Sequence, residues 1–549
     1  MAKSTRRGPR KAAAPPSEPG PVVPAHFGKV SRSPTNPHRG EPRHAFDVAD
    51  LYRGPAGDAE PTSEGDGGRD ASEKLRQAYF WIVNTAIISP FYDIEYQEGT
   101  SPTFTLGDSK VRVMLPSGQS YSSFCLLPLL NLVARRRCLL VGGPGRGKTA
   151  SAVLMGVLAG YSIRDIQRAI QHGQPQMTIA DLLGNPLPSD LVKAERMDQV
   201  RIAWRKWLGM RVKIIDEYNR IPTRTQSALL TVMGDNYAEM LDQVYECPEA
   251  AWYLTANDDA GGGTYQVIEA LRDRIDVVVK ALHFNTRFLG ELLERIEAGV
   301  KPEAIVPPEI VFGEAEIDAA HRRILAVRVP VEIRRRMEFF CSQFEFFEPG
   351  ARQLEYMTKD TVKLSGIDFQ QMAGQETGKD RVKDVGGQTR NGVSVRALMT
   401  GLLFVKAMAW FRGNDAVELE DLRQILPFVL HDKLVPNLSS PFFEQPGNQP
   451  LRADRVSWIR TLLDLSCEEY QRLDLDANDP VAAMQAEFAA GLDSLGEEDT
   501  RTRLVRIERL LGEYAQGRKF YGHMYDDVLH LKYLHQRYTN YLRWLTWGR

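Results

Sequence analysis

The chain has 549 residues, of which 43% are hydrophobic and 26% are charged, and its formal net charge is -2. This length predicts about three globular domains, and the balanced charge excludes a global basic field that would attract nucleic acid. The five cysteines are scattered without a Cys-x-x-Cys pair, and no apolar run reaches about 18 residues. These patterns exclude a disulfide framework, a zinc site of the usual spacing and a membrane span, and we expect a protein of the reducing cytoplasm.

Residues 1–72 are rich in Pro, Gly, Ser and charge and show almost no apolar periodicity. We therefore expect a disordered tail. Its basic start lacks the apolar core of a secretory signal. We interpret this basic cluster as solvated, with contact to nucleic acid or an acidic partner as the alternative. A helix is predicted from Ala71, then a β-hairpin over 103–106 and 111–115, and a second helix over 122–134.

The next segment, residues 142–149, reads Gly-Gly-Pro-Gly-Arg-Gly-Lys-Thr between an apolar strand and a helix of small residues. This is a P-loop in its required context. Successive backbone N–H groups of such a loop point at phosphate oxygens, and the helix N-terminus adds positive charge beneath them. We expect Lys148 to reach the β- and γ-phosphates of ATP and Thr149 to hold Mg²⁺. The predicted nucleotide-binding residues are Gly142, Gly143, Pro144, Gly145, Arg146, Gly147, Lys148, Thr149 and Ala150.

Residues 137–282 alternate strands and helices, which predicts a parallel sheet covered on both faces. One β-branched strand ends in Asp216 and Glu217, so both carboxylates should lie at the sheet edge beside the P-loop. We expect Asp216 to hold Mg²⁺ and Glu217 to orient and polarise the attacking water. Another apolar strand ends near Asn257, whose amide is expected beside the γ-phosphate. The alternative is an asparagine that caps a turn.

Arg274 precedes the last predicted strand of this region, over 277–279. An arginine at this edge faces away from its own nucleotide, and in a ring it could reach the γ-phosphate of a neighbouring subunit. A salt bridge with Asp273 or Asp276 is the alternative, and Arg272 competes for the catalytic role.

After residue 282 helices dominate. Residues 350–393 are polar and glycine-rich, which favours a long mobile insertion, and residues 437–449 have the composition of a linker. Residues 451–549 show two apolar helical stripes. We expect these stripes to form the core of a small helical domain, with an exposed partner-binding groove as the alternative.

Over residues 73–435 the chain resembles the MoxR-type AAA+ ATPases. Tyr218 and Thr231 depart from the usual family pattern, and Ile275 replaces a phenylalanine but keeps its apolar character. The matching segments, in chain order, are 181–184, 216–222, 226–233, Asn257 with Gly263, Thr264 and Tyr265, 269–274, 393–397 and 429–431.

The resemblance implies an α/β AAA+ core over 73–282 with a five-stranded parallel sheet, an α-helical lid over 283–436, and an added all-α domain over 451–549. It also implies a homo-oligomeric ring, taken as a hexamer. Such a ring hydrolyses ATP with Mg²⁺ and remodels or activates a partner protein, often one with a von Willebrand A domain. Arg396 would contact the γ-phosphate from the lid of the same subunit, and a hairpin around 239–247 would line the pore.

Two other functions remain open from the sequence. A nucleic-acid motor or loader on the same core usually carries Lys or Arg on this hairpin, whereas residues 240–246 are acidic. A nucleotide-switched scaffold that barely hydrolyses ATP is less compatible with intact Glu217 and Arg274.

Overall fold

The computed structural model describes residues 71–108, 111–193, 200–257, 269–299, 301–373, 384–492, 495–517 and 519–547. The predicted tail, except Ala71 and Ser72, lies outside these ranges. Gly263, Thr264 and Tyr265 and residues 374–383 of the predicted insertion also lie outside them.

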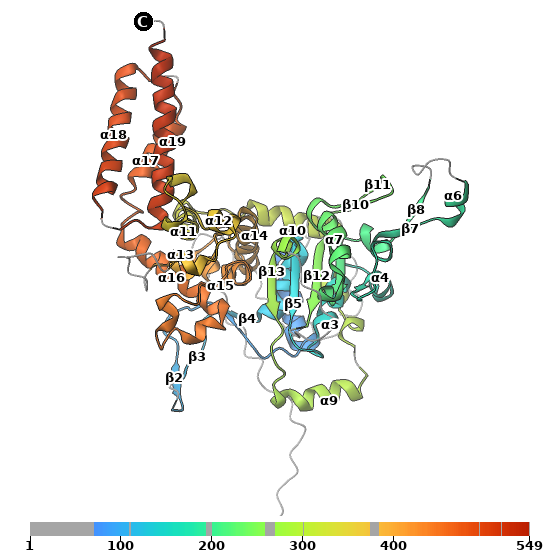
Figure 1. The fold of residues 1–549 in the computed structure, drawn as a ribbon. Coiled ribbons are helices and arrows are strands. Elements are labelled where there is room, and N and C mark those ends of the chain that lie inside the picture. Colours follow the sequence, from blue (N-terminus) through green and yellow to red (C-terminus); the bar gives the residue numbers. More distant parts are fainter. Residues whose placement is uncertain are drawn as a thin grey trace, which may run out of the picture. The chain divides into compact units, whose positions relative to one another are not determined.

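A five-stranded sheet stands at the centre of the core, and its strands all run parallel, as predicted (Figure 1). The strand order across the sheet is β13-β5-β12-β9-β6. The bounds are β5 Arg137–Val141, β6 Gln171–His172, β9 Val212–Asp216, β12 Ala251–Ala256 and β13 Val277–Lys280. Because β5, β12 and β9 are adjacent, the chain segments that follow them meet at one edge of the sheet.

Helices cover this sheet because its strands are apolar on both faces. Helices α2 (Ser123–Ala134) and α3 (Lys148–Leu158) pack against the strands. A buried cluster joins the strands to α5 (Ile179–Leu183) and α7 (Thr223–Asp235), with the Trp207 and Trp252 rings edge to face at 5.7 Å. The remaining helices of the core region are α1 Ala71–Trp81, α4 Ile163–Ala169, α6 Pro188–Lys193, α8 Glu269–Arg274 and α9 Leu289–Glu297.

Within the described residues, four short antiparallel strand pairs lie outside the central sheet. The predicted hairpin near residue 105 is β2 (Thr103–Leu106) with β3 (Val111–Met114), and the one at 239–247 is β10 (Tyr237–Met240) with β11 (Gln243–Glu246). The other two pairs are β1 (Ile94–Glu95) with β4 (Ser120–Tyr121), and β7 (Gly184–Pro186) with β8 (Ile202–Trp204).

The lid region is helical, as expected. Its main helices are α10 Glu314–Ala326, α11 Val331–Ser342, α14 Val395–Arg412 and α15 Leu419–Leu430. The Ser394 side chain caps α14 by accepting a hydrogen bond from the Ala397 N–H at 3.2 Å. Helix α14 packs on α2 of the core as well as on α15, so lid and core share a continuous contact.

Composition predicted a long mobile insertion over 350–393, whereas the described part of this stretch folds into helices. It contains α12 (Lys359–Ser365) and α13 (Phe369–Ala373). Phe347, Val362 and Phe369 form a small buried cluster there. A few large apolar side chains therefore fold a stretch whose average composition is polar.

The predicted linker 437–449 also packs, because Phe442 and Phe443 are buried and the Phe443 ring lies 5.9 Å from that of Trp458. The C-terminal helices are α16 Arg455–Arg472, α17 Pro480–Ala489, α18 Glu497–Gln516 and α19 Gly522–Leu545. The two predicted stripes meet in a core of their own that includes Ile507 and Leu534. Within the described ranges, every helix is too short or too polar to span a bilayer.

Candidate functional site

The loop between β5 and α3 has the curled backbone that a phosphate cradle requires. Gly142 has φ 155°, and a Cβ atom there would lie 2.6 Å from the backbone oxygen of Ala281, so a side chain is excluded. Gly147 has φ 74° and forms the N-cap of α3. This left-handed conformation favours glycine. The first turn of α3 therefore presents its backbone N–H groups toward the loop.

Lys148 is buried at the start of α3 and joins the P-loop to the end of β12. Its Nζ donates hydrogen bonds to the backbone oxygens of Gly142 at 2.7 Å and Gly143 at 2.8 Å. A third bond runs from Nζ to Asn257 Oδ1 at 2.9 Å. The ammonium group is thus held where the loop curls.

The other P-loop residues differ in exposure. Pro144, Gly145 and Ala150 are exposed. Arg146 lies over Gly143 and donates from Nη1 to the Ala281 backbone oxygen at 3.0 Å, which ties the loop to the end of β13.

Thr149 and Asp216 come together beside the loop. The Thr149 hydroxyl donates to Asp216 Oδ1 at 2.8 Å, and the Thr255 hydroxyl donates to the same oxygen at 2.6 Å. Mg²⁺ takes hard oxygen ligands and usually binds one or two protein groups together with substrate phosphates. The Thr149 hydroxyl and the Asp216 carboxylate fit that requirement. Among the described residues no cluster of three or more His, Cys, Asp or Glu side chains offers a fuller protein cage.

Glu217 follows β9 in a left-handed conformation, with φ 52° and ψ 48°. Such strain in a residue other than glycine is found mainly at functional sites. Asn257 Nδ2 donates to Glu217 Oε1 at 3.0 Å, and Arg220 Nε lies 3.2 Å from Glu217 Oε2. Gly173 permits this turn, because a Cβ atom there would lie 2.2 Å from the Glu217 backbone oxygen. The carboxylate is held from both sides and remains partly exposed.

Sequence reasoning missed Thr255, Gly173, Arg220 and His172. Thr255 is the most informative, because its hydroxyl bonds Asp216 and also accepts the Glu217 N–H at 2.9 Å. A polar residue in a buried, otherwise apolar strand is a signal that could have found it. His172 Nδ1 lies 3.4 Å from Asp216 Oδ2. The two-residue strand β6 gave no periodicity that would indicate it.

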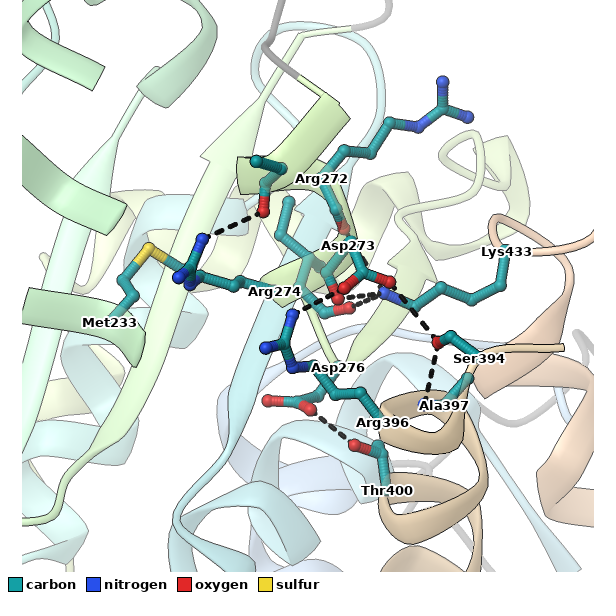
Figure 2. Close-up of polar contacts among 12 residues, drawn as sticks. Met233, Arg272, Asp273, Arg274, Asp276, Ser394, Arg396, Ala397, Thr400 and Lys433 are labelled. Carbon is teal, nitrogen blue, oxygen red and sulfur yellow. Dashed lines mark hydrogen bonds and ion pairs between the residues drawn. The ribbon is translucent and has the colours of Figure 1, made fainter. Parts of the chain in front are cut away.

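The predicted arginines lie at the end of α8, where the lid meets the core (Figure 2). Arg274 points toward Met233, and its Nη1 donates a hydrogen bond to the Ala270 backbone oxygen at 3.5 Å. The carboxylates proposed as its alternative partners are engaged elsewhere: Asp273 bonds Arg396, and Asp276 bonds Arg137 and Thr400. Among the described residues, no carboxylate pairs with Arg274.

Arg272 and Arg396 are paired with acids. Arg272 donates a hydrogen bond to Asp432 at 2.9 Å. Burial alone would raise the pKa of the Asp432 carboxyl, but the Arg272 guanidinium outweighs this effect and lowers it. Arg396 Nη1 lies 2.5 Å from Asp273 Oδ2 (Figure 2). The resemblance implied that Arg396 reaches the nucleotide of its own subunit. In the structure, its guanidinium instead pairs with Asp273 on α8, the residue next to Arg274.

Lys433 completes this junction. Its Nζ donates to the Asp273 backbone oxygen at 2.8 Å and also bonds the Ile275 oxygen, so a cation satisfies carbonyl groups at the C-terminal end of α8. Burial lowers the pKa of Lys433. The lid thus holds the arginine-bearing helix through both side chains and backbone.

Comparison with known proteins agrees with this architecture. Residues 137–277 match the model of the ATPase family associated with various cellular activities (AAA), and residues 383–454 match the AAA lid domain. The chain is 23% identical to "Chaperone MoxR1" of Mycobacterium tuberculosis over 311 residues, which cover 56% of this chain and 70% of that protein. These matches support the resemblance of the chain to the MoxR-type AAA+ ATPases.

A crystal structure of an ATPase candidate from Cytophaga hutchinsonii shares 17% identity, with a TM-score of 0.42, and covers 61% of this chain and 89% of that one. The AAA family match spans the sheet from β5 to the start of β13, and the lid match includes α14 and α15. A match to the AAA family implies nucleotide binding, usually with Mg²⁺.

Proposed function

We propose that the chain binds ATP with Mg²⁺, hydrolyses it at the subunit interfaces of a homo-oligomeric, hexameric ring, and uses the cycle to remodel or activate a partner protein. The observation that carries this proposal is one hydrogen-bonded network. It links the P-loop to the ends of β9 and β12 through Lys148, Asn257 and Glu217. The five free cysteines are compatible with a reducing compartment such as the cytoplasm.

Each member of the network has a separate role. Lys148 balances charge on the β- and γ-phosphates, while Thr149 and Asp216 hold Mg²⁺, which supplies further positive charge at the phosphates. Glu217 orients the attacking water and accepts its proton. Asn257 keeps the Glu217 carboxylate turned toward the phosphate end of the site, because its amide bonds both Glu217 and Lys148.

Arg274 is proposed to act on the neighbouring subunit. It has no carboxylate partner among the described residues, so its charge is available to a phosphate. Phosphoryl transfer benefits from such an arginine supplied in trans. Arg396 lies on the same surface, and in a ring it would also belong to the interface with the next subunit.

A protein partner is favoured over nucleic acid by the β10–β11 hairpin. This hairpin carries Glu239, Asp242 and Glu246 and no Lys or Arg, which opposes phosphate binding. Val244 on the same hairpin is 59% exposed and offers an apolar contact to a polypeptide. A von Willebrand A-domain protein is the partner class that the family resemblance implies.

Two variants test the nucleotide chemistry. Lys148→Ala should lose binding of a slowly hydrolysed ATP analogue in isothermal titration, because it removes the charge that meets the phosphates. Glu217→Gln should retain binding and lose at least about 10² of the turnover rate. Glu239→Gln on the exposed hairpin is the matched control and should hydrolyse ATP at the wild-type rate. Wild-type turnover by Glu217→Gln would overturn the assignment of the catalytic carboxylate.

A further inference from the structure

Helix α9 exposes an unusually apolar side. It has no buried residue, and Leu289, Leu293 and Ile296 are 47%, 48% and 64% exposed. Their spacing places them on one side of the helix, and we call this set the α9 stripe. A helix of nine residues is marginal in water without packing. We therefore expect another surface to pack against the α9 stripe.

The chain places α9 at the nucleotide-binding edge of the sheet. Lys280, the last residue of β13, is in register with Val141, the residue before the P-loop. Helix α9 follows soon after, and Arg295 anchors it through a hydrogen bond from Nη1 to the Ala86 backbone oxygen at 3.3 Å. Figure 1 shows α9 beyond the ends of the strands, apart from the other helices. The α9 stripe thus follows the end of β13 on the side of the sheet where the P-loop follows β5.

A second apolar patch lies beside the arginines at the other surface. Val395 and Met399, one helical turn apart at the start of α14, are 72% and 64% exposed, and we call them the α14 patch. Arg396, on the same turn, is 46% exposed although it pairs with Asp273. The α14 patch thus lies beside Arg396, whose partner Asp273 directly precedes Arg274 in the chain.

Two different patches on two surfaces suit a ring. A cyclic assembly uses a heterologous interface, in which one surface of a subunit meets a different surface of the next. The charges are complementary as well, because Glu297 flanks the α9 stripe on its helix and Arg396 flanks the α14 patch. Approach of Arg274 to a neighbouring P-loop would bring the two patches toward each other.

We propose that the α9 stripe of one subunit docks on the α14 patch of the next copy of this chain, with Glu297 facing Arg396. This inference rests on the proposed function, since it takes the ring and the trans position of Arg274 as given. The contact couples the nucleotide-binding edge of one subunit to the lid of its neighbour. Movement of the core of one subunit or of the lid of its neighbour is then transmitted directly across the interface.

Cysteine crosslinking between separately tagged full-length chains tests the contact. Leu293→Cys in one chain and Met399→Cys in the other, mixed with ATP and a mild oxidant, should form a mixed disulfide dimer. Cys341 and Cys467 are replaced by serine in every chain, because they are the two partly exposed cysteines, whereas the other three are buried. Leu293→Cys mixed with Val505→Cys is the matched control, since Val505 on α18 is 62% exposed but lies on neither patch. This control should give no mixed dimer.

Sedimentation provides the second arm. Leu293→Asp should reduce the assembled fraction in ATP at least ten-fold without lowering the melting temperature, and Val505→Asp should leave assembly unchanged. A wild-type ring together with normal assembly of Leu293→Asp and no 293–399 crosslink would overturn the docking contact and leave the proposed function standing. A wild-type chain that stays monomeric in ATP would overturn both.

Discussion

The two surfaces of the core that carry candidate catalytic residues are built differently. Around the P-loop, the polar side chains bond one another: Lys148 with Asn257, Asn257 with Glu217, and Thr149 with Asp216. Where the lid meets the end of α8, Arg272 and Arg396 are bound to acids, whereas Arg274 has no carboxylate partner in the described part of the chain. In the proposed function, the first surface binds ATP and activates the attacking water, and the second supplies Arg274. Under the proposed function, catalysis therefore requires two subunits to meet.

Arg274→Ala should cause the largest loss of ATPase activity among the variants that test this comparison. Loss of a trans arginine is expected to lower kcat by about 10²–10³, because charge developing on the γ-phosphate loses its partner. Arg272→Ala is the matched control. It breaks a partly exposed ion pair with Asp432 and should change kcat less than about ten-fold. Steady-state ATPase assays on assembled protein measure both, and equal losses would break the distinction between the two arginines.

Thr255→Val should have an intermediate effect on the P-loop side. The shape is kept, but the hydroxyl that bonds Asp216 and accepts the Glu217 N–H is lost, at about 1 kcal/mol or more per bond. We expect a fall of about ten-fold in kcat and a higher Mg²⁺ concentration for half-maximal activity. Thr225→Val removes a partly buried hydrogen bond to the Met177 backbone oxygen away from the site, and it should leave Mg²⁺ dependence unchanged. A similar shift of the Mg²⁺ dependence in both variants would show that Thr255 contributes only to packing.

Lys213→Met should change stability and leave ATP hydrolysis unaltered. Lys213 is fully buried on β9 beside the Trp252 ring, and burial lowers its pKa from 10.5 to about 8. Because the folded pKa lies below the unfolded one, the wild-type free energy of unfolding should rise between pH 8 and 10.5. The variant should lose that rise and gain about 1–3 kcal/mol at pH 7. Denaturant unfolding at several pH values checks this, and an unchanged pH profile would show that Lys213 is not the titrating group.

The order of the core elements was predictable because its signals are local. Three signals can each be recognised within about ten residues: the P-loop, the strand before Asp216 and the strand before Asn257. Parallel strands then bring their carboxyl ends to one edge of the sheet. The hydrogen bonds through Thr255 depend on how β9 and β12 are aligned, which periodicity does not encode. Average composition did not predict the helices of 350–393, because Phe347, Val362 and Phe369 are enough to form the small core there.

Arg396 shows the limit of motif reasoning most clearly. Its motif was recognisable, but its position depends on how the lid packs on the core. Helix α14 lies against α2, and contacts such as Thr400 Oγ1 to Asp276 Oδ1 at 2.5 Å hold its first turns at α8. No short segment of the sequence contains that arrangement. The site residues at the sheet edge remain predictions until variants are measured.

Mixing two inactive variants tests most directly whether the two surfaces work in different subunits. Arg274→Ala protein keeps its own P-loop network, and Glu217→Gln protein keeps its arginine. In an equal, random mixture, about a quarter of the interfaces would join an intact site to an intact arginine. We predict that the mixture recovers about that fraction of wild-type ATPase activity, and that the recovery depends on protein concentration. Activity no greater than the sum of the separate variants, from chains shown to co-assemble, would contradict the account and place Arg274 within its own subunit.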